Sequence, residues 1–381
     1  MFERRLNLPP PGTETFFLWG PRQTGKSTLL RGAYPEALWI DLLKSEESRR
    51  YLQNPERLRE EIAARPVDQV VIDEIQKVPA LLDEIHWLME NGGPSFALCG
   101  SSARKVKRGA ANLLGGRAVR YELFGLSAVE IGAEVDLDRL LNHGYLPRAY
   151  LSERPTRLLN SYVSDYLREE VLAEALVRDA PVFAEFLTLA ALTDTEQVNF
   201  SNIAREAGTS GPTVKAYFEI LVDTLLGRWL QPYRRRPKRR VSAAAKFYFA
   251  DVGVVNYLAR RGTLSRRSEL YGKAFENWIH HELTTYAAYS ESFTELSYWR
   301  LSTGAEVDFI VNDMELAVEA KATAKVTDHH LRGMRELARD HAEVRQRVVV
   351  SLEDRSRKTG DGILVVPAGE FVAALWRGEY F

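Results

Sequence analysis

The sequence has little of what anchors a chain in a membrane or cross-links a secreted one. Of its 381 residues one is cysteine, Cys99, so the chain cannot form an internal disulfide or a thiolate zinc site. No stretch approaches the roughly 18 to 20 apolar residues that cross a bilayer. The N-terminus leads from Met1–Arg5 into prolines and not into the apolar core of a secretory signal. These absences predict a soluble protein of the cytoplasm without membrane contacts.

An excess of either charge is also missing, because 51 Lys and Arg face 52 Asp and Glu, for a net charge of -1. The overall charge therefore predicts no general attraction to nucleic acid, although local clusters still count. The hydrophobic fraction of 45% and charged fraction of 27% are ordinary for globular proteins, which excludes disordered, collagen-like and coiled-coil chains. The length fits two or three domains, each with its own core.

Residues 1–125 alternate short apolar runs with helical patterns. The runs are too short for helices, and the spacing between them leaves room for crossover helices. This alternation is typical of a parallel α/β sheet. The expected strands are Phe16–Trp19, Leu38–Ile40, Val70–Ile72 and Phe96–Leu98.

A glycine-containing loop follows the first run and precedes a helical pattern. Gly20–Ser27 reads G-x-x-x-x-G-K-S, in which glycines let backbone N–H groups turn toward phosphate oxygens. The N-terminus of the next helix adds its positive end to this anion site. We expect Lys26 to reach the β- and γ-phosphates of ATP and the Ser27 hydroxyl to ligate Mg²⁺. The residues expected to hold the nucleotide are Gly20, Pro21, Arg22, Gln23, Thr24, Gly25, Lys26, Ser27 and Thr28.

Two further strand ends carry polar residues that suit ATP hydrolysis. The third run ends in Asp73 and Glu74, and we expect Asp73 to hold Mg²⁺ while Glu74 polarises the attacking water. The fourth run leads to Ser101, whose hydroxyl is predicted to sense the γ-phosphate. Arg117 follows a Gly-Gly pair and is predicted to reach the γ-phosphate of a neighbouring subunit, with Arg120 as the second choice. A plain surface arginine is the alternative.

The segments GPRQTGKST, VVIDEIQKVP, LCGSSARK and LLGGRA resemble the AAA-type ATP-binding proteins of bacteria and archaea that end in domain of unknown function 4143. The resemblance continues through His143–Pro147, Tyr162–Glu169 and Lys246–Asp251, and so covers nearly the whole chain. His143 departs from the double glycine usual in that segment. The resemblance implies ATP and Mg²⁺ as cofactors and a homo-oligomer that shares its active sites, such as a hexameric ring.

Residues 126–265 read as a helical lid followed by a winged-helix-like unit. Ser201 is expected to cap one short helix, and Ser210 with Pro212 to begin a second. Such a pair of helices can place Thr213 and Lys215 in a DNA groove. A helical module that serves only for oligomerisation is the alternative. The apolar stripe expected on the second helix consists of Val214, Phe218, Leu221 and Leu225.

A basic stretch follows at the position of the wing. Between Arg228 and Lys246 there are eight basic residues and no acid, which favours contacts with DNA phosphates. A solvated run of charge is the alternative. The DNA-contacting residues expected are Lys215, Arg234, Arg235, Arg236, Lys238, Arg239 and Arg240.

Residues 266–381 carry a group of acids on two adjacent strand patterns. Alternation places Asp308 on one strand and Glu319 with Lys321 on the next, joined by a turn at Asn312–Asp313. An antiparallel hairpin would bring them together, either as a Mg²⁺ site for phosphodiester cleavage or as a cross-strand salt bridge. The upstream helical pattern at residues 272–289 supplies Glu276.

The order of these acids resembles the restriction-endonuclease-like core. It implies Asp308 and Glu319 as metal ligands, Lys321 as the group that positions water or phosphate, and Glu276 as an auxiliary acid. Such folds also serve as binding modules that do not cleave. The sequence thus predicts a Mg²⁺-dependent ATPase that remodels or processes DNA. The alternative is a nucleotide-gated regulatory or defence switch that binds a protein partner and carries an inactive nuclease-like domain.

Overall fold

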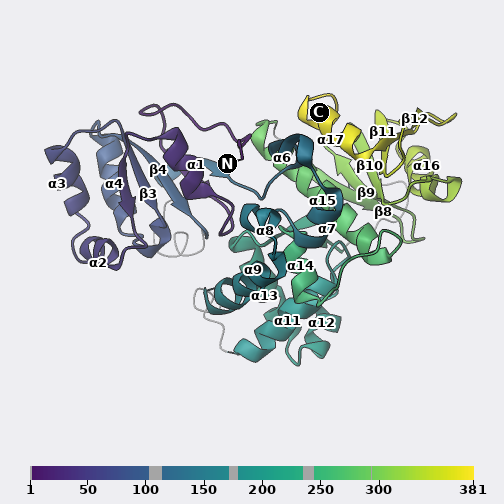
Figure 1. Ribbon diagram of the computed structural model, residues 1–381, viewed down its shortest axis with the longest axis horizontal. Coiled ribbons are helices and arrows are strands. Elements are labelled where there is room, and N and C mark those ends of the chain that lie inside the picture. The colour runs from purple at the N-terminus through teal and green to yellow at the C-terminus, as the bar shows by residue number, and fades with distance from the viewer. Residues whose placement is uncertain (1, 103–113, 171–178, 235–243, 293) are drawn as a thin grey trace.

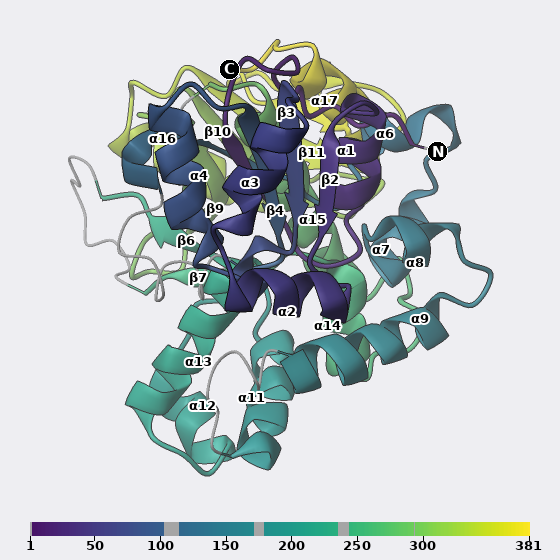
Figure 2. The ribbon, with the colours of Figure 1, turned by 90° about the vertical axis from the view of Figure 1, so that its left-hand side faces the viewer.

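The computed structural model describes residues 2–102, 114–170, 179–234, 244–292 and 294–381. An N-terminal sheet lies on the left of Figure 1, a C-terminal sheet on the right, and helices α9 and α11–α13 below them. Figure 2 views the N-terminal sheet from the front, with the C-terminal part behind it. Within the described ranges no helix is long and apolar enough to span a membrane.

The N-terminal part is a five-stranded parallel sheet in the order β2-β3-β4-β1-β5. The four strands predicted from apolar runs are confirmed within one or two residues at each end, whereas β5 was not predicted. The strands are β1 (Phe16–Trp19), β2 (Leu38–Asp41), β3 (Gln69–Asp73), β4 (Ser95–Gly100) and β5 (Val119–Glu122). The helices are α1 (Lys26–Ala33), α2 (Ser45–Gln53), α3 (Arg57–Ala64) and α4 (Leu81–Glu90).

The middle part is helical, and aromatic side chains such as Phe183, Phe186 and Phe218 fill its core. A π-helix over Tyr162–Glu170 directly follows α9. The helices are α6 (Ala128–Ile131), α7 (Leu137–His143), α8 (Pro147–Leu151), α9 (Pro155–Ser161), α11 (Ala180–Leu192), α12 (Phe200–Glu206), α13 (Gly211–Asp223) and α14 (Val252–Leu258).

The two predicted helices of the winged-helix-like unit are α12 and α13. Ser210 caps α13 as expected, by accepting a hydrogen bond from the backbone N–H of Thr213. The expected cap of α12 is wrong, because Asn199 holds that position and its side chain accepts from Asn202 N–H. Leu225 lies beyond the end of α13 with φ 60°, so it does not extend the apolar stripe of that helix.

The C-terminal part is a mixed eight-stranded sheet in the order β12-β13-β11-β10-β9-β8-β6-β7. Its last two strands, β6 and β7, come from the middle part. Strand β6 joins them to the C-terminal strands by pairing in parallel with β8 through Gln231 and Pro232. The strands are β6 (Gly227–Pro232), β7 (Lys246–Phe249), β8 (Leu296–Arg300), β9 (Glu306–Val311), β10 (Leu316–Lys321), β11 (Gln346–Ser351), β12 (Arg357–Lys358) and β13 (Leu364–Pro367). The helices are α15 (Glu269–Tyr289), α16 (Arg332–Asp340) and α17 (Ala368–Trp376).

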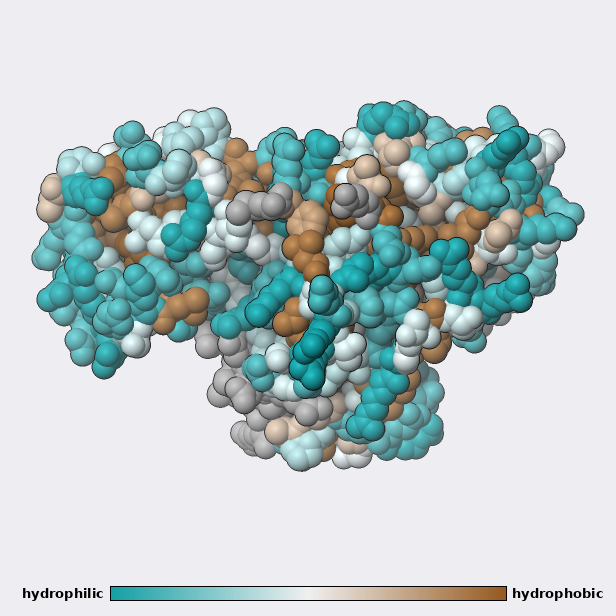
Figure 3. Space-filling model, viewed as in Figure 1, coloured by the Kyte–Doolittle hydropathy of each residue, from teal (hydrophilic) through white to brown (hydrophobic). Residues whose placement is uncertain are grey.

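Large exposed hydrophobic side chains are scattered among these parts. Most of the face in Figure 3 is hydrophilic, and its apolar patches are small and separated by polar side chains. Packing inside each part therefore covers most of the apolar surface on this face. Among the described residues, the large hydrophobic side chains that remain exposed are Leu43, Leu52, Trp87, Val119, Leu151, Leu192 and Leu270.

Helix α15 carries a buried acid that joins three segments. The Glu282 carboxylate is fully buried and accepts hydrogen bonds from Ala128 N–H (2.7 Å), from Trp278 Nε1–H (3.1 Å) and from Trp376 Nε1–H (3.0 Å). These donors belong to α6, α15 and α17. Burial raises the pKa of Glu282 to about 7, because a charged carboxylate loses its hydration there.

We expect this carboxylate to make the fold less stable as the pH rises. An unfolded glutamate loses its proton near its ordinary pKa of 4.5, whereas folded Glu282 keeps it to about pH 7. The free energy of unfolding therefore falls between these values and levels off above pH 7. Burial lowers the pKa values of His280 and His281 to about 3, so these side chains oppose the trend only below about pH 6.5.

Melting temperatures at pH 6.5 and pH 8 test this expectation. Glu282→Gln should reduce the difference between the two values, because one titrating group is removed. The matched control Glu379→Gln, which removes an exposed acid paired with Arg377, should leave the difference unchanged. An undiminished difference in Glu282→Gln would contradict the assignment.

Candidate functional site

The predicted phosphate loop connects β1 to α1 and turns back on itself. Gly25, at φ 96°, directly precedes α1, and a Cβ on Gly20 would lie 2.4 Å from the backbone oxygen of Leu123. Both positions therefore require glycine. Lys26 is buried, and its Nζ donates to the carbonyl oxygens of Gly20 (2.7 Å) and Pro21 (3.0 Å). The loop carbonyls thus hold an ammonium that phosphate oxygens would bind more strongly.

The predicted magnesium ligands lie together, Ser27 in the first turn of α1 and Asp73 at the end of β3. Ser27 Oγ donates to Asp73 Oδ2 at 2.7 Å, and Cys99 Sγ donates to Asp73 Oδ1 at 2.8 Å. A hydroxyl beside a carboxylate is an oxygen donor set that suits Mg²⁺ bound to phosphates. Burial raises the pKa of Cys99 well above its ordinary value, so this thiol stays protonated and acts as a donor. These residues fit the ion.

A polar network links the predicted catalytic acid to the predicted sensor. Gln76 Nε2 donates to Glu74 Oε2 and to Ser101 Oγ, the latter at 3.2 Å, and all three side chains are buried. Glu74 has a left-handed backbone, at φ 60°, directly after β3. Sequence reasoning missed Gln76, although it lies within the segment VVIDEIQKVP, because only the fold brings it beside Ser101.

The structure places Arg117 far from its own phosphate loop. Strand β5 runs parallel to β1, with Val119 opposite Phe16 and Glu122 opposite Trp19. Arg117 precedes β5 and therefore lies at the edge of the sheet opposite the loop that follows Trp19. Its Nε pairs with Glu90 Oε1 at 2.7 Å, and about half of its side chain is exposed. A nucleotide on its own loop is thus out of reach of this side chain. Arg120 is exposed on β5.

Arg4 lies behind the phosphate loop and was not predicted to have a role. Its guanidinium donates to the carbonyl oxygens of Thr24 (2.6 Å) and Phe124 (2.7 Å) and pairs with Glu130 at 2.9 Å. It also lies 3.4 Å from the Tyr289 hydroxyl at the end of α15. The N-terminal segment thus connects the loop to the middle and C-terminal parts. No local motif carries this signal.

The expected DNA-contacting residues are placed only in part. Lys215 is exposed on α13, and Arg234 is exposed after β6. Two members of the basic stretch have internal partners instead: Arg228 pairs with Glu122 and lies 4.6 Å from the Phe124 ring centre, and Lys246 is buried. The other predicted residues, Arg235, Arg236, Lys238, Arg239 and Arg240, lie outside the described ranges.

The predicted hairpin of the C-terminal part is confirmed. Strands β9 and β10 are antiparallel, with Phe309 opposite Val318, which brings Asp308 and Glu319 together. Asp308 Oδ2 accepts from Ala320 N–H at 2.9 Å, and Glu319 pairs with Lys321 at 2.6 Å. The acids are buried, and burial raises the pKa of Glu319 to about 8.

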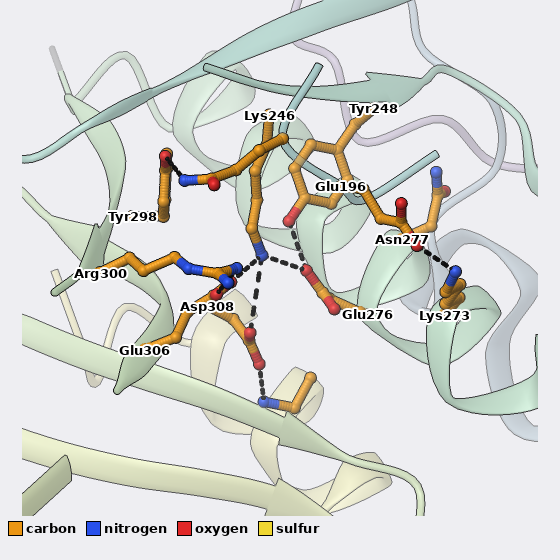
Figure 4. A network of polar contacts seen from close by, with 12 residues as sticks. Glu196, Lys246, Tyr248, Lys273, Glu276, Asn277, Tyr298, Arg300, Glu306 and Asp308 are labelled. Carbon is orange, nitrogen blue, oxygen red and sulfur yellow. Dashed lines mark hydrogen bonds and ion pairs between the residues drawn. The ribbon is translucent and has the colours of Figure 1, made fainter. Parts of the chain in front are cut away.

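Glu276 faces the same cluster from α15, but a lysine lies between it and the hairpin. Lys246 Nζ is 3.0 Å from Glu276 and 3.9 Å from Asp308, and it also pairs with Glu306 (Figure 4). Among the described residues there is no group of three or more acidic, histidine or cysteine side chains that could hold a metal ion. The arrangement therefore does not fit the predicted metal site at Asp308 and Glu319.

Comparison with known families divides the chain into three matches. An AAA domain model matches residues 13–132, a domain of unknown function (DUF8612) matches residues 134–265, and a domain of unknown function (DUF4143) matches residues 271–371. The first match contains Lys26, Asp73 and Ser101. The third contains the β9–β10 hairpin.

Most of the chain is similar to uncharacterized proteins of several bacteria. Uncharacterized proteins of Mycobacterium bovis and Mycobacterium tuberculosis are each 26% identical over 367 residues, which cover 93% of this chain and 80% of theirs. An uncharacterized protein of Haemophilus influenzae is 24% identical and covers 68% of both chains.

A solved structure of the replication initiator DnaA bound to AMPPCP and single-stranded DNA aligns at a TM-score of 0.30 and 14% identity, over 56% of this chain and 83% of that one. The family matches and the phosphate-loop geometry agree on the N-terminal part, where the chain has the residues of a P-loop ATP-binding site. The chain thus carries an AAA domain at residues 13–132 and a domain of unknown function 4143 at residues 271–371.

Proposed function

We propose that this protein is a Mg²⁺-dependent ATPase that couples ATP hydrolysis to the binding and remodelling or processing of DNA. The observation that carries the ATPase proposal is the contact between Ser27, in the first turn of α1 beside Lys26, and Asp73, at the end of β3. Separate sequence segments supply the parts of one phosphate and magnesium site.

Each residue of the site has a separate role in the proposed reaction. Lys26 would leave the carbonyl oxygens of Gly20 and Pro21 to bind phosphate oxygens, while Ser27 and Asp73 would hold Mg²⁺. The ion supplies charge neutralisation at the phosphates. Glu74 would orient the attacking water, with Gln76 fixing the carboxylate and linking it to Ser101. Catalysis of this kind depends on positioning and on charge more than on covalent chemistry.

Separate substitutions should divide binding from hydrolysis. Lys26→Ala removes a charged hydrogen-bond donor to phosphate and should weaken ATP binding about tenfold or more. Glu74→Gln keeps the phosphate contacts and should retain affinity while kcat falls by roughly a hundredfold or more. Equilibrium binding of ATP and steady-state turnover measure the two effects. An active Glu74→Gln protein would refute the assignment of this carboxylate.

We also propose that the active form is a homo-oligomer in which Arg117 completes the site of the next subunit. The position of Arg117 at the sheet edge opposite its own phosphate loop supports this arrangement. Its present partner, Glu90, lies at the end of α4 and is about half exposed. Because an exposed ion pair is weak, Arg117 can leave Glu90 for a phosphate of the next subunit. A ring of subunits, such as a ring of six, is one form that the proposed oligomer can take.

If Arg117 acts across subunits, turnover per subunit should rise with protein concentration. Arg117→Ala should bind ATP yet hydrolyse it about a thousandfold more slowly, as for removal of an arginine finger. Mixing it with Lys26→Ala should restore part of the activity, because an intact Arg117 then faces an intact phosphate loop. Arg120→Ala, on β5, tests the second choice: a loss of turnover in this variant and not in Arg117→Ala would assign the role to Arg120. Turnover that is independent of concentration, with no recovery on mixing, would contradict the oligomer.

The DNA proposal depends on α13 and on the basic run at residues 234–240. Replacement of the basic residues of the run by alanine should weaken binding to all DNA sequences about equally. The slope of log affinity against log salt should flatten by about 0.9 for each duplex phosphate that the variant no longer neutralises. Lys273→Ala is the control and should leave the slope unchanged, because Lys273 on α15 already pairs with Glu196 and Glu269. An unchanged slope in the run variant would mean that the run is a solvated surface.

A nucleotide-gated switch that acts on a protein partner is the second candidate. The contacts of Arg4 favour it, because they connect the carbonyl of Thr24 in the phosphate loop to Tyr289 on α15. Such a switch needs no DNA. Salt-independent binding of partners, with an ATPase rate that duplex, single-stranded and branched DNA leave unchanged, would support it over the first proposal.

Cleavage of DNA by Asp308, Glu319, Lys321 and Glu276 stays a prediction. The lysine between Glu276 and Asp308 gives it no support.

A further inference from the structure

Four acids converge in the C-terminal part, from three different elements. Glu276 comes from α15, Glu306 and Asp308 from β9, and Glu319 from β10. Asp308 and Glu319 are 5% exposed, and Glu276 and Glu306 are mostly covered. Like charges held this close and away from water repel one another strongly unless cations lie among them. The folded chain must therefore supply those cations.

One of these cations is Lys246, which lies outside the predicted motif. Lys246 begins β7, a strand of the middle part, and its side chain is 4% exposed. In Figure 4 the Lys246 ammonium lies between Glu276 and Asp308, with Glu306 beside it. We propose that Lys246 is a built-in counter-ion that occupies the place of a divalent cation in this cluster, so that the cluster is closed to metal.

Each carboxylate already has a cationic partner within 4 Å. Lys246 forms ion pairs with Glu276 and Asp308, and Lys321 forms an ion pair with Glu319 at 2.6 Å. Glu306 pairs with Lys246 and also with Arg300 at 2.7 Å. A divalent ion that arrived here would have to displace an ammonium whose side chain is buried.

Neutral donors bind to the same carboxylates. The Tyr248 hydroxyl donates to Glu276 Oε1 at 2.6 Å, and Ala320 N–H donates to Asp308 Oδ2 at 2.9 Å. Mg²⁺ requires a nearly ideal octahedron of oxygens, and Ca²⁺ requires six to eight. Carboxylate oxygens that already accept from N–H and O–H groups are poor candidates for that role.

The same lysine ties the middle part to the C-terminal part. Strand β7 is at the end of the shared sheet and pairs only with β6 among the described strands. Lys246 and Tyr248 both reach Glu276 on α15 from this strand. Removal of the ammonium would leave buried anions without compensation, which is strongly destabilising.

Mn²⁺ binding to the nucleotide-free full-length chain tests the proposal. Wild type and Asp308→Asn should show the same Mn²⁺ isotherm, followed by the paramagnetic resonance of free Mn²⁺, because Asp308 binds no metal. Lys246→Met should have a lower melting temperature and should gain a Mn²⁺ site at least tenfold tighter than any in wild type. Mn²⁺ should restore part of the decrease in melting temperature.

Two controls make the gain specific. Lys246→Met combined with Asp308→Asn should not show the new site. Lys273→Met, which removes a lysine of α15 that pairs with Glu196 and Glu269, should gain none. The proposal is overturned by a wild-type Mn²⁺ site that disappears in Asp308→Asn. A folded Lys246→Met protein that gains no site would overturn it as well. If Lys246→Met does not fold, the comparison of wild type with Asp308→Asn decides alone.

Discussion

A charge that is removed from water must be paired, and the junctions between the parts of this chain are built from such pairs. Arg4 meets Glu130 and two backbone carbonyls where the phosphate loop joins the middle part. Lys246 meets Glu276 where the middle part joins the C-terminal sheet. Breaking one partner of such a pair leaves the other buried and alone. These polar contacts hold the three parts in one arrangement together with the apolar clusters that cross the same junctions.

This construction gives the nucleotide site a direct link to the rest of the molecule. Arg4 donates to Thr24 in the phosphate loop and to Phe124 in the segment that leaves β5, and it lies against Tyr289 on α15. The Tyr289 hydroxyl in turn accepts a hydrogen bond from Phe124 N–H at 3.1 Å. A loop that shifts when phosphate binds would disturb contacts in all three parts. These contacts connect the phosphate loop to the middle and C-terminal parts.

The C-terminal acids illustrate how one pattern supports two chemistries. Asp308 and Glu319 are brought together by the predicted hairpin, and this geometry would serve a metal ion or a set of ion pairs equally. The difference lies in Lys246, which is 62 residues upstream of Asp308 and belongs to a different part of the chain. The sequence presents this lysine as the end of a basic stretch. The fold buries it among acids.

What the sequence determined by itself is local. Apolar runs and turn residues predicted β1 to β4 and the β9–β10 hairpin, and the spacing of Lys26, Ser27 and Asp73 predicted their meeting, because strand ends of a parallel sheet share one edge. The tertiary structure decided the rest: the sheet that joins β6 to β8, the positions of Arg4 and Gln76, and the partner of Lys246. Such contacts join residues far apart in the chain or side chains without a motif. Periodicity and spacing report which face of an element is apolar, but the neutralisation of a buried charge depends on what the folded chain places beside it.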